Sequence, residues 1–444
     1  MSRLFGTDGV RGIAGTELTR DLARRLGEAA GTLLGEGGRG RIVVGRDTRA
    51  SGEMLEAALV EGIRSAGCDA LLAGIIPTPA VALLTRELGA DGGAVISASH
   101  NPAEYNGIKF FSRDGFKLPD ELEDDIEARV SSPQRPVRPA GARAGVASAI
   151  DDAVERYVAH AVATVPEGLA GLKVALDCGH GAAAVSSETA FLRLGAEVVA
   201  VNCDWNGTDI NAGCGSTHLE SLVDLVRESG ADLGIAHDGD ADRALAVDET
   251  GAVVDGDRIM AVIAAQLKGE SRLSHDMVVS TVMANIGFEV AMRDLGVSVA
   301  RTAVGDRYVL DGMRSAGAML GGEQSGHIIF LEHATTGDGL VTALQLARVM
   351  RVTGKPLSVL ASVMTCYPQV LVNVRVTDKG RAAASSAVAA AIATEERVLG
   401  DNGRVLVRSS GTEPLVRVMV EAADLRVAQA IAERLAAVVE RESR

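Results

Sequence analysis

The segment HDGDADR, residues 237–243, carries three carboxylates at alternate positions. Asp238, Asp240 and Asp242 come directly after the apolar run ADLGIA, which is typical of a buried strand. Like charges crowded at a strand end are costly unless a cation neutralises them, and Mg²⁺ prefers a few oxygen ligands accompanied by a phosphate. The segment therefore predicts a divalent-metal site, with a solvated acidic turn as the simpler alternative.

Two other interpretations of this segment remain open. Counted from Asp238, Glu249 is the twelfth residue, as in an EF-hand loop, but Arg243 stands where that loop needs glycine. A strand, rather than a helix, also precedes the segment. In a phosphatase of the D-x-D kind, Asp238 would be a nucleophile and Asp240 a general acid. That mechanism would leave Asp242 and the serine segment described next without a role.

The segment AVISASHNP, residues 94–102, runs from an apolar strand into small hydroxyls, a histidine and Asn-Pro. A hydroxyl held in such a turn lies close to where helix N-termini supply N–H groups, so Ser99 could carry a phosphate. A hydrolase nucleophile normally stands in G-x-S-x-G, whereas Ala98 and His100 flank this serine, so an acyl-enzyme is disfavoured. A capped turn without function is the alternative.

Two glycine-containing loops have side chains that suit a phosphorylated sugar. GGEQSGH, residues 321–327, combines three glycines with hydroxyl-binding groups at Glu323, Ser325 and His327, although it could be only a turn before the strand IIF. RSSGTEP, residues 408–414, offers a guanidinium, hydroxyls and turn N–H groups, which bind phosphate without a metal. The candidate phosphate ligands in and just after this loop are Arg408, Ser410, Gly411, Thr412 and Arg417.

Alternating apolar runs and amphipathic stretches predict the elements that position these loops. The first round predicts strand, helix, strand, helix and strand at 42–45, 52–66, 69–75, 78–88 and 93–97. Ser51 is placed to cap the first of these helices, and Gly67 to end it. Right-handed crossovers then give a parallel sheet, with the serine segment at the carboxyl end of a strand, where catalytic loops belong.

The same rhythm returns twice, so we expect an α/β protein with three similar mixed α/β domains. The Pro- and Arg-rich stretch 131–145 has no periodicity and indicates a linker that closes the first domain. After residue 368 the pattern changes to strands around an Ala-rich helix and then a terminal helix, which predicts a smaller C-terminal α+β domain. The expected boundaries are 1–150, 151–255, 256–368 and 369–444.

Charge and cysteine usage limit the partners. The 44 Lys and Arg against 59 Asp and Glu give a net charge of −15, which argues against nucleic acid as the main partner. Five dispersed cysteines without a C-x-x-C pair indicate reduced thiols rather than a disulfide framework or a zinc site. No stretch reaches membrane-spanning length, and no apolar leader opens the chain. We expect a cytoplasmic enzyme that does not engage a membrane.

Taken together, these segments resemble the α-D-phosphohexomutase family, and within it the branch that acts on amino-sugar phosphates. The resemblance runs essentially end to end through LFGTDGVRG, ISASHNP, NGIKFF, CGSTH, DGDADR, TAVGDRYV, GGEQSGH, TTGDG and SGTEPLVRVM. It implies four domains around a central cleft, each supplying one of the loops described above. Two positions depart from the expected pattern: Ser409 replaces a proline, and His180 replaces an asparagine.

The resemblance implies a role for each candidate residue. Ser99 would be a phosphoserine, and its phosphate and the three aspartates would hold one Mg²⁺. Catalytic residues near the transferring phosphate would be Ser99, His100, Lys109 and Arg243. For Lys109 and Arg243 a structural ion pair is the alternative. Substrate would be bound by Arg11, Glu323, Ser325, His327, Arg408, Ser410, Gly411, Thr412 and Arg417.

The implied reaction is a phosphoryl exchange. Phospho-Ser99 donates its phosphate to a hexosamine phosphate, and the resulting hexose 1,6-bisphosphate turns over and returns its other phosphate to the serine. The bisphosphate would also act as activator, and the protein would be a monomer or a homodimer. A phosphoserine beside three carboxylates is tolerable only with a divalent ion. A glucose or mannose phosphate mutase, a metal-dependent sugar phosphatase and a silent sugar-phosphate binder are the alternatives.

Overall fold

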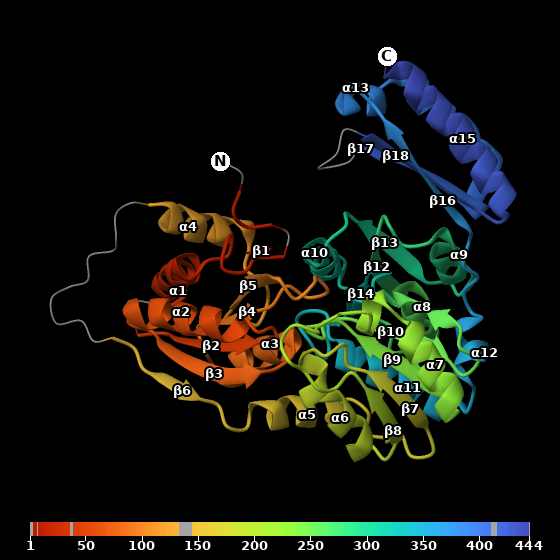
Figure 1. Ribbon diagram of the computed structural model, residues 1–444. Coiled ribbons are helices and arrows are strands. Elements are labelled where there is room, and N and C mark those ends of the chain that lie inside the picture. The colour runs from red at the N-terminus through yellow and green to blue at the C-terminus, as the bar shows by residue number, and fades with distance from the viewer. Residues whose placement is uncertain (1–2, 7, 36–38, 133–143, 410–414, 444) are drawn as a thin grey trace. The chain divides into compact units, whose positions relative to one another are not determined.

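The computed structural model describes residues 3–6, 8–35, 39–132, 144–409 and 415–443. The chain forms two compact units, one of residues 1–282 and 300–361 and the other of residues 283–299 and 362–444. Strands and helices are interspersed along the described part of the chain (Figure 1). No described helix is both long enough and apolar enough to cross a membrane. Most of the linker expected at 131–145 falls outside the described residues.

The N-terminal sheet has six strands in the order β1-β5-β4-β2-β3-β6. The strands are β1 (Val10–Ile13), β2 (Arg41–Arg46), β3 (Asp69–Ile75), β4 (Gly92–Ile96), β5 (Tyr105–Ser112) and β6 (Ala147–Ala149). The helices are α1 (Arg20–Leu34), α2 (Gly52–Ser65), α3 (Thr78–Glu87) and α4 (Asp120–Ser131). Strands β4, β2, β3 and β6 run parallel, as the βαβαβ pattern predicts. Strands β5 and β1 add an antiparallel edge that the sequence pattern did not indicate.

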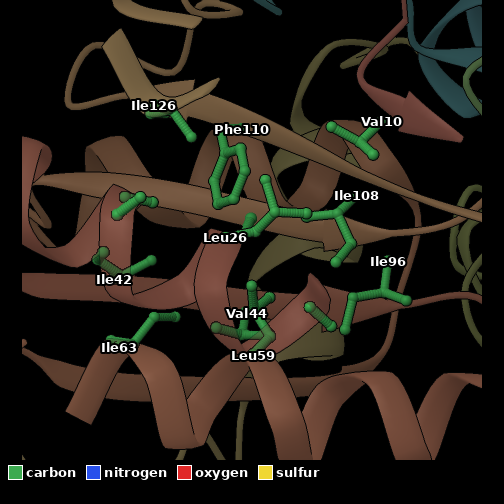
Figure 2. Close-up of a cluster of buried hydrophobic side chains, with 14 of the residues drawn as sticks. Val10, Leu26, Ile42, Val44, Leu59, Ile63, Ile96, Ile108, Phe110 and Ile126 are labelled. Atoms are coloured by element: carbon green, nitrogen blue, oxygen red, sulfur yellow. The ribbon is translucent and has the colours of Figure 1, made fainter. Parts of the chain in front are cut away.

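One face of this sheet packs against α1, α2 and α4 (Figure 2). Ile42, Val44 and Ile96 extend from the strands toward Leu26 of α1 and Leu59 of α2, and all five side chains are fully buried. Side chains alternate across a strand, so the opposite face is left for α3, which packs on β2 and β4. The sheet is thus covered on both sides, and its functional loops emerge at the carboxyl ends of the parallel strands.

The second sheet has the order β11-β10-β9-β7-β8. Its strands are β7 (Lys173–Asp177), β8 (Glu197–Val201), β9 (Leu233–His237), β10 (Ala244–Asp248) and β11 (Val253–Val254). The accompanying helices are α5 (Ala153–Ala163), η1 (Ala182–Val185), α6 (Ser187–Arg193), η2 (Gly215–Thr217) and α7 (Glu220–Ser229). Because β8, β7 and β9 are parallel, their carboxyl ends share one edge. The acidic segment follows β9 at that edge, and the antiparallel β10 carries the chain back.

The third sheet has the order β13-β12-β14-β15. Its strands are β12 (Met277–Thr281), β13 (Ser298–Thr302), β14 (Leu320–Gly322) and β15 (Ile328–Phe330). Its helices are α8 (Gly256–Gly269), η3 (Ser274–Asp276), α10 (Asp306–Ala316), α11 (Gly339–Thr353) and α12 (Leu357–Ala361). The loop GGEQSGH joins β14 to β15 as the tip of an antiparallel hairpin.

The second unit contains a three-stranded antiparallel sheet in the order β16-β18-β17. Its strands are β16 (Gln369–Arg375), β17 (Gly403–Ser409) and β18 (Leu415–Ala422). Its helices are α9 (Ile286–Asp294), α13 (Lys379–Ala383), α14 (Ser386–Leu399), η4 (Gly400–Asn402) and α15 (Leu425–Glu442). Glu421 ties the 283–299 segment to this sheet, because its buried carboxylate accepts the Ile286 amide at 2.9 Å and pairs with Arg404 at 3.0 Å.

One local prediction is wrong. Ser51 stands before α2, but its backbone is already helical and its hydroxyl makes no capping bond. That hydroxyl instead accepts a hydrogen bond from the Asn106 side chain at 2.9 Å. The β5 partner, which the sequence pattern did not reveal, therefore competes for the hydroxyl that would have capped the helix. Gly67 follows the end of α2 with φ +94°, as expected for a residue that ends a helix.

Glycines let α1 and α2 cross at backbone contact. A Cβ added at Gly62 would lie 2.0 Å from the Arg24 carbonyl oxygen, and one at Gly27 would lie 2.1 Å from that of Leu59. No side chain can move to relieve either clash, because each neighbouring atom belongs to a helix backbone. The close approach of α1 and α2 therefore requires glycine at both positions.

We expect Gly62→Ala to lower the free energy of unfolding by about 1–3 kcal/mol, because forcing the helices apart outweighs the better helix propensity of alanine. Gly269→Ala, at the end of α8, is the matched control, since nothing lies within 4 Å of its added Cβ. Thermal and urea unfolding of both variants would check this. Equal midpoints for the two variants would contradict the role of the close crossing.

Candidate active site and metal centre

Three buried carboxylates gather at the carboxyl end of β9. Asp238, Asp240 and Asp242 each offer one oxygen, and the three oxygens lie within 4.8 Å of one another. In the turn between β9 and β10 that carries them, Ala241 adopts a left-handed conformation, with φ +55°. Asp238 and Asp240 are completely buried, and Asp242 is nearly so.

The pKa values of Asp238 and Asp240 shift in opposite directions. Burial, followed by the neighbouring Asp242 and Asp240, raises the pKa of Asp238 well above its ordinary value. Burial would also raise the pKa of Asp240, but the Lys109 ammonium and a hydrogen bond from Thr78 outweigh it, so this pKa is lowered. The Lys109 Nζ lies 3.0 Å from Asp240, and the Thr78 hydroxyl donates to it at 2.7 Å.

The oxygens left over in this cluster fit a cation. Asp240 Oδ1 and Asp242 Oδ1 are buried and have no hydrogen-bond partner among the described residues. Buried polar atoms are nearly always satisfied, so two carboxylate oxygens without hydrogen-bond partners in one cluster favour a divalent ion there. Glu249, the twelfth position of the EF-hand alternative, instead bonds to Ser358. The structure therefore does not support the EF-hand interpretation.

Ser99 lies directly beside this cluster. It follows β4 on the first sheet, is only 1% exposed, and donates a hydrogen bond from Oγ to Asp238 Oδ2 at 2.5 Å. The His100 Nδ1 lies 3.3 Å from the same hydroxyl. Burial, followed by the cations Arg243 and Arg11, lowers the pKa of His100. Two sheets thus bring a buried serine, an imidazole and three carboxylates to one place.

A buried ion pair sets the shape of the serine loop. Ser99 has φ +52°, a conformation that non-glycine residues rarely adopt. Its amide donates to Ser97 Oγ at 2.9 Å, and that hydroxyl donates to Asp47 at 2.6 Å. Asp47 also accepts from the Arg49 Nε at 2.9 Å. The loop conformation is therefore fixed from the end of β2, the strand next to β4.

The Arg49 guanidinium also binds the loop directly. Its two terminal nitrogens donate to four carbonyl oxygens, those of Ser99 at 2.9 Å, Asn101 at 2.8 Å, Tyr105 at 2.9 Å, and Pro102. Asn211, from the second sheet, donates to the Ser99 carbonyl as well, at 2.9 Å. Arg49 itself is 1% exposed. The serine hydroxyl is thus held at the edge of a backbone cage.

Lys109 connects the acidic cluster to the N-terminal segment. Its Nζ lies 3.0 Å from Asp240, 3.6 Å from Asp242 and 3.3 Å from Asp8. Burial disfavours the ammonium, but these carboxylates outweigh it and raise the pKa of Lys109. Asp8 also pairs with Arg11 and with Lys117. Because of these cations, the pKa of Asp8 is well below its ordinary value in spite of its burial.

The third sheet contributes His327 and Asp306. Lys117 of the first sheet pairs with Asp306, whose carboxylate lies 3.6 Å from the His327 Nε2. The same Nε2 lies 3.9 Å from Asp242, and neither ring nitrogen has a hydrogen-bond partner among the described residues. Alternating charges therefore run from Asp8 through Lys117 and Asp306 to this imidazole, which faces the acidic cluster.

The remaining candidate residues of the first unit flank this centre. Arg243 Nε lies 3.9 Å from Asp238 and 3.8 Å from Asp242, and these carboxylates raise its pKa despite burial. Glu323 accepts a hydrogen bond from the Gly305 amide at 3.1 Å, at the start of α10. Ser325 is partly exposed at the hairpin tip between Glu323 and His327.

Arg408 and Arg417 belong to the second unit. They are directly opposite each other on the antiparallel strands β17 and β18, and opposite residues of such a pair share one face. The structure therefore places the two arginines opposite each other on one face of this sheet. The other members of the expected phosphate loop, Ser410, Gly411 and Thr412, lie outside the described residues.

Sequence reasoning did not assign the residues that support this site. Asp47 and Arg49 follow β2 in GRDTR, so polar residues at a strand end were a usable signal. Asp8 and Asp306 lie within LFGTDGVRG and TAVGDRYV, which were noted as segments without roles for these residues. Lys117 had no sequence signal, because its partners come from distant parts of the chain.

Four family models match successive parts of the chain. They are described as phosphoglucomutase/phosphomannomutase alpha/beta/alpha domains I, II and III and the C-terminal domain, and they match residues 2–136, 155–251, 255–367 and 371–438. A phosphoglucosamine mutase from Arthrobacter sp. is 55% identical over 445 residues, covering 99% of this chain and 98% of the relative.

Solved structures share the fold. A phosphoglucomutase/phosphomannomutase family protein from Burkholderia thailandensis matches with a TM-score of 0.84 and 24% identity, over 100% of this chain and 99% of that one. The N-acetylphosphoglucosamine mutase of Aspergillus fumigatus, solved with GlcNAc-6P and magnesium, matches with a TM-score of 0.71 and 18% identity, over 99% of this chain and 96% of that one.

We expect a divalent cation to stabilise the protein, because it would neutralise the buried carboxylates. At a hundredfold excess of Mg²⁺ or Mn²⁺ over its Kd, the gain would be about 2.7 kcal/mol, visible as a higher Tm. Asp240→Asn should remove most of this gain. Glu249→Gln is the control and should keep it. Equal losses in the two variants would argue against the cluster as the binding site.

Arg49→Lys should destabilise the serine loop, because an ammonium cannot reach four carbonyls and Asp47 at once. We expect a loss of more than about 2 kcal/mol in the free energy of unfolding, with faster hydrogen exchange of the 97–102 amides. Arg46→Lys, whose partners Glu53 and Glu56 lie nearer the surface, is the control and should cost less than about 1 kcal/mol. Unchanged hydrogen exchange of the 97–102 amides in Arg49→Lys would contradict the role of Arg49 in holding the serine loop.

Proposed function

Because the chain belongs to the phosphoglucomutase/phosphomannomutase family, we propose that it interconverts glucosamine 6-phosphate and glucosamine 1-phosphate. It is a phosphohexomutase, an isomerase that moves a phosphoryl group within one sugar. The observation that carries the proposal is the 2.5 Å contact between Ser99 Oγ and Asp238, inside a buried cluster of three carboxylates.

Ser99 is the residue that carries the phosphoryl group. Phosphorylation adds a charge of about −1.5 to −2 beside Asp238, Asp240 and Asp242. The metal proposed for this site is Mg²⁺, held by these three carboxylates and an oxygen of the serine phosphate. When bound, Mg²⁺ supplies charge stabilisation for the phosphoryl group and its leaving oxygen. The magnesium found with the Aspergillus fumigatus enzyme supports this choice.

The catalytic side chains around Ser99 have separate tasks in the proposed reaction. Lys109 and Arg243 bring positive charge to the transferring phosphoryl group, as donors that burial fixes in place. His100, 3.3 Å from the serine oxygen and with a lowered pKa, offers a neutral ring nitrogen at the point of transfer. These groups are positioned before substrate arrives, so little reorganisation accompanies the reaction.

Substrate binding is assigned to groups around this centre. We assign the binding of the sugar hydroxyls to Glu323, Ser325 and His327. Arg11, in the N-terminal segment, is a further proposed substrate-binding residue. The non-reacting phosphate is assigned to the second unit. Arg408 and Arg417 are opposed there on neighbouring strands, and guanidinium groups are well suited to bind phosphate oxygens. The loop residues proposed to complete that site are Ser410, Gly411 and Thr412.

The exchange proceeds through a bound bisphosphate. Phospho-Ser99 transfers its phosphoryl group to the free position of the hexosamine phosphate and gives a hexose 1,6-bisphosphate. That molecule reorients, and its other phosphoryl group returns to Ser99. A hexose 1,6-bisphosphate added from outside primes the enzyme by phosphorylating the serine. Exclusion of water protects the phosphoserine from hydrolysis, which fits the 1% exposure of this residue.

We propose that the protein acts in the cytoplasm as a monomer or homodimer. Neither nucleic acid nor a membrane is a proposed partner. All five cysteines lie within the described residues and none of them forms a disulfide there, which suits a reducing compartment. A net charge of −15 disfavours nucleic acid, whereas local cations such as Lys109 and Arg243 still accept a small phosphorylated sugar.

The direct test is incubation with glucosamine 6-phosphate, Mg²⁺ and a catalytic amount of glucose 1,6-bisphosphate, followed by phosphorus NMR. We expect glucosamine 1-phosphate, with higher kcat/KM than for the glucose and mannose phosphates. Faster turnover of glucose or mannose phosphate would reassign the substrate. Release of inorganic phosphate without isomerisation would replace the mutase by a phosphatase.

Ser99→Ala should lower mutase turnover by at least about 10³-fold, because the phosphoryl acceptor is lost. The variant should still show the metal-dependent rise in Tm, since the three carboxylates remain. Labelling by a hexose bisphosphate carrying ³²P, followed by peptide mapping, should place the phosphate on residue 99 of the wild type. Full activity of Ser99→Ala would exclude the phosphoserine mechanism.

A further inference from the structure

Two cysteines lie with their sulfur atoms close together behind the metal segment. Cys178 follows β7 and Cys203 lies just after β8, and these parallel strands are neighbours in the second sheet. Their Sγ atoms are 3.0 Å apart. The other three cysteines, Cys68, Cys214 and Cys366, come from different parts of the chain, and Cys68 donates to the Gly31 carbonyl. The pair takes no part in the proposed reaction.

The two thiols are chemically different. Cys178 is fully buried, and its contact with Cys203 together with burial raises the pKa of its thiol well above the ordinary value. Cys203 is partly exposed, and the hydrogen bond with Cys178 lowers the pKa of its thiol. Once Cys203 has lost its proton, the Cys178 thiol can donate to the resulting thiolate. The partly exposed Cys203 is therefore the better nucleophile, and the buried Cys178 lies next to it.

We propose that Cys178 and Cys203 form a redox-modification site, at which a peroxide converts the two thiols into a reversible disulfide. This assignment is independent of the proposed mutase activity. It rests on the 3.0 Å separation, the exposure of one thiol and the burial of the other.

The chemistry balances with the peroxide as the only co-reactant. The Cys203 thiolate attacks one peroxide oxygen, the O–O bond breaks, and a sulfenic acid and one water form from hydrogen peroxide after protonation. The Cys178 sulfur then attacks the Cys203 sulfur, its proton leaves with the hydroxyl as a second water, and the S–S bond forms. Two thiols are oxidised and the peroxide is reduced by two electrons. A dithiol reductant reverses the step by thiol exchange.

The backbone around the pair allows the bond to form with little movement. The Cys178 amide donates to the Val201 carbonyl at 3.2 Å, so the two strand ends are already joined beside the sulfurs. Sulfurs at 3.0 Å need to approach by about 1 Å to reach a disulfide length. Cys178 also packs with Ala241, which stands between Asp240 and Asp242. The modification site is therefore directly behind the metal segment.

The test uses hydrogen peroxide on the whole protein, with Cys366→Ser as background because Cys366 is exposed. Peroxide should lower the mass of the intact protein by about 2 Da. After alkylation and digestion with trypsin, the peptides 174–193 and 194–227 should be linked, and fragmentation should place the link at Cys203 and leave Cys214 alkylated. Dithiothreitol should remove the link. Cys203→Ser in the same background should leave Cys178 alkylatable. Over-oxidation of Cys203 with Cys178 still free, or no linked peptide, would overturn the proposal.

A second readout needs no additional variant. Trp205 is the single tryptophan of the chain and lies two residues after Cys203. Formation of the disulfide should change its fluorescence at the rate at which the linked peptide accumulates, and dithiothreitol should restore the signal. A linked peptide whose kinetics do not match the Trp205 signal would indicate that the link forms only during sample handling, and would count against the site.

Discussion

The repulsion among three buried carboxylates is the constraint on which the rest of the structure depends. Asp238, Asp240 and Asp242 stand within a few ångströms of one another with almost no solvent to separate them. Within the protein, Lys109 and Arg243 offset part of this repulsion, and the proposed divalent ion would offset it at the remaining oxygens. Each other feature of the site can be understood as a way of supplying, placing or using that positive charge.

Three sheets contribute residues to this site. The carboxyl edge of the first sheet brings Ser99 from one strand and its supporting residues Asp47 and Arg49 from the next. The second sheet delivers the acidic turn itself. The third adds Asp306 and His327 through an ion pair with Lys117. Because groups of opposite charge face each other between the sheets, the ion pairs help to hold the three sheets together around the acidic cluster.

The sequence predicted the periodic part of the fold well. Strand β3 was predicted with its observed limits, and the predictions for β2, α2, α3 and β4 differ from the observed limits by one residue at each changed end, because local hydrophobic period and helix-ending residues dominate there. The antiparallel β5 was not recognised, since its pairing with β4 and β1 is set by distant residues. The same dependence explains the error at Ser51, whose hydroxyl is claimed by Asn106 of that strand.

The residues proposed to react were identifiable by type and spacing, and the residues that support them were not. Ser99 and the three aspartates stand in short segments with an unusual density of polar groups after apolar strands. Arg49 and Lys117, in contrast, are single cations whose partners are far away in sequence, such as Asp306. Only a three-dimensional arrangement shows that Arg49 binds four carbonyls of one loop. Family resemblance added the identity of the chemistry, which no pattern of residue types could give.

The Asp47 and Arg49 couple has an additional consequence for turnover. Its opposite charges cancel at 2.9 Å, so the scaffold under the serine contributes little net field at the hydroxyl. In the proposed mechanism Ser99 changes its charge during the catalytic cycle, and the Asp47–Arg49 ion pair beneath it is rigid and adds little net charge. The loop can therefore keep one shape in that mechanism, whether Ser99 bears a neutral hydroxyl or a phosphate dianion.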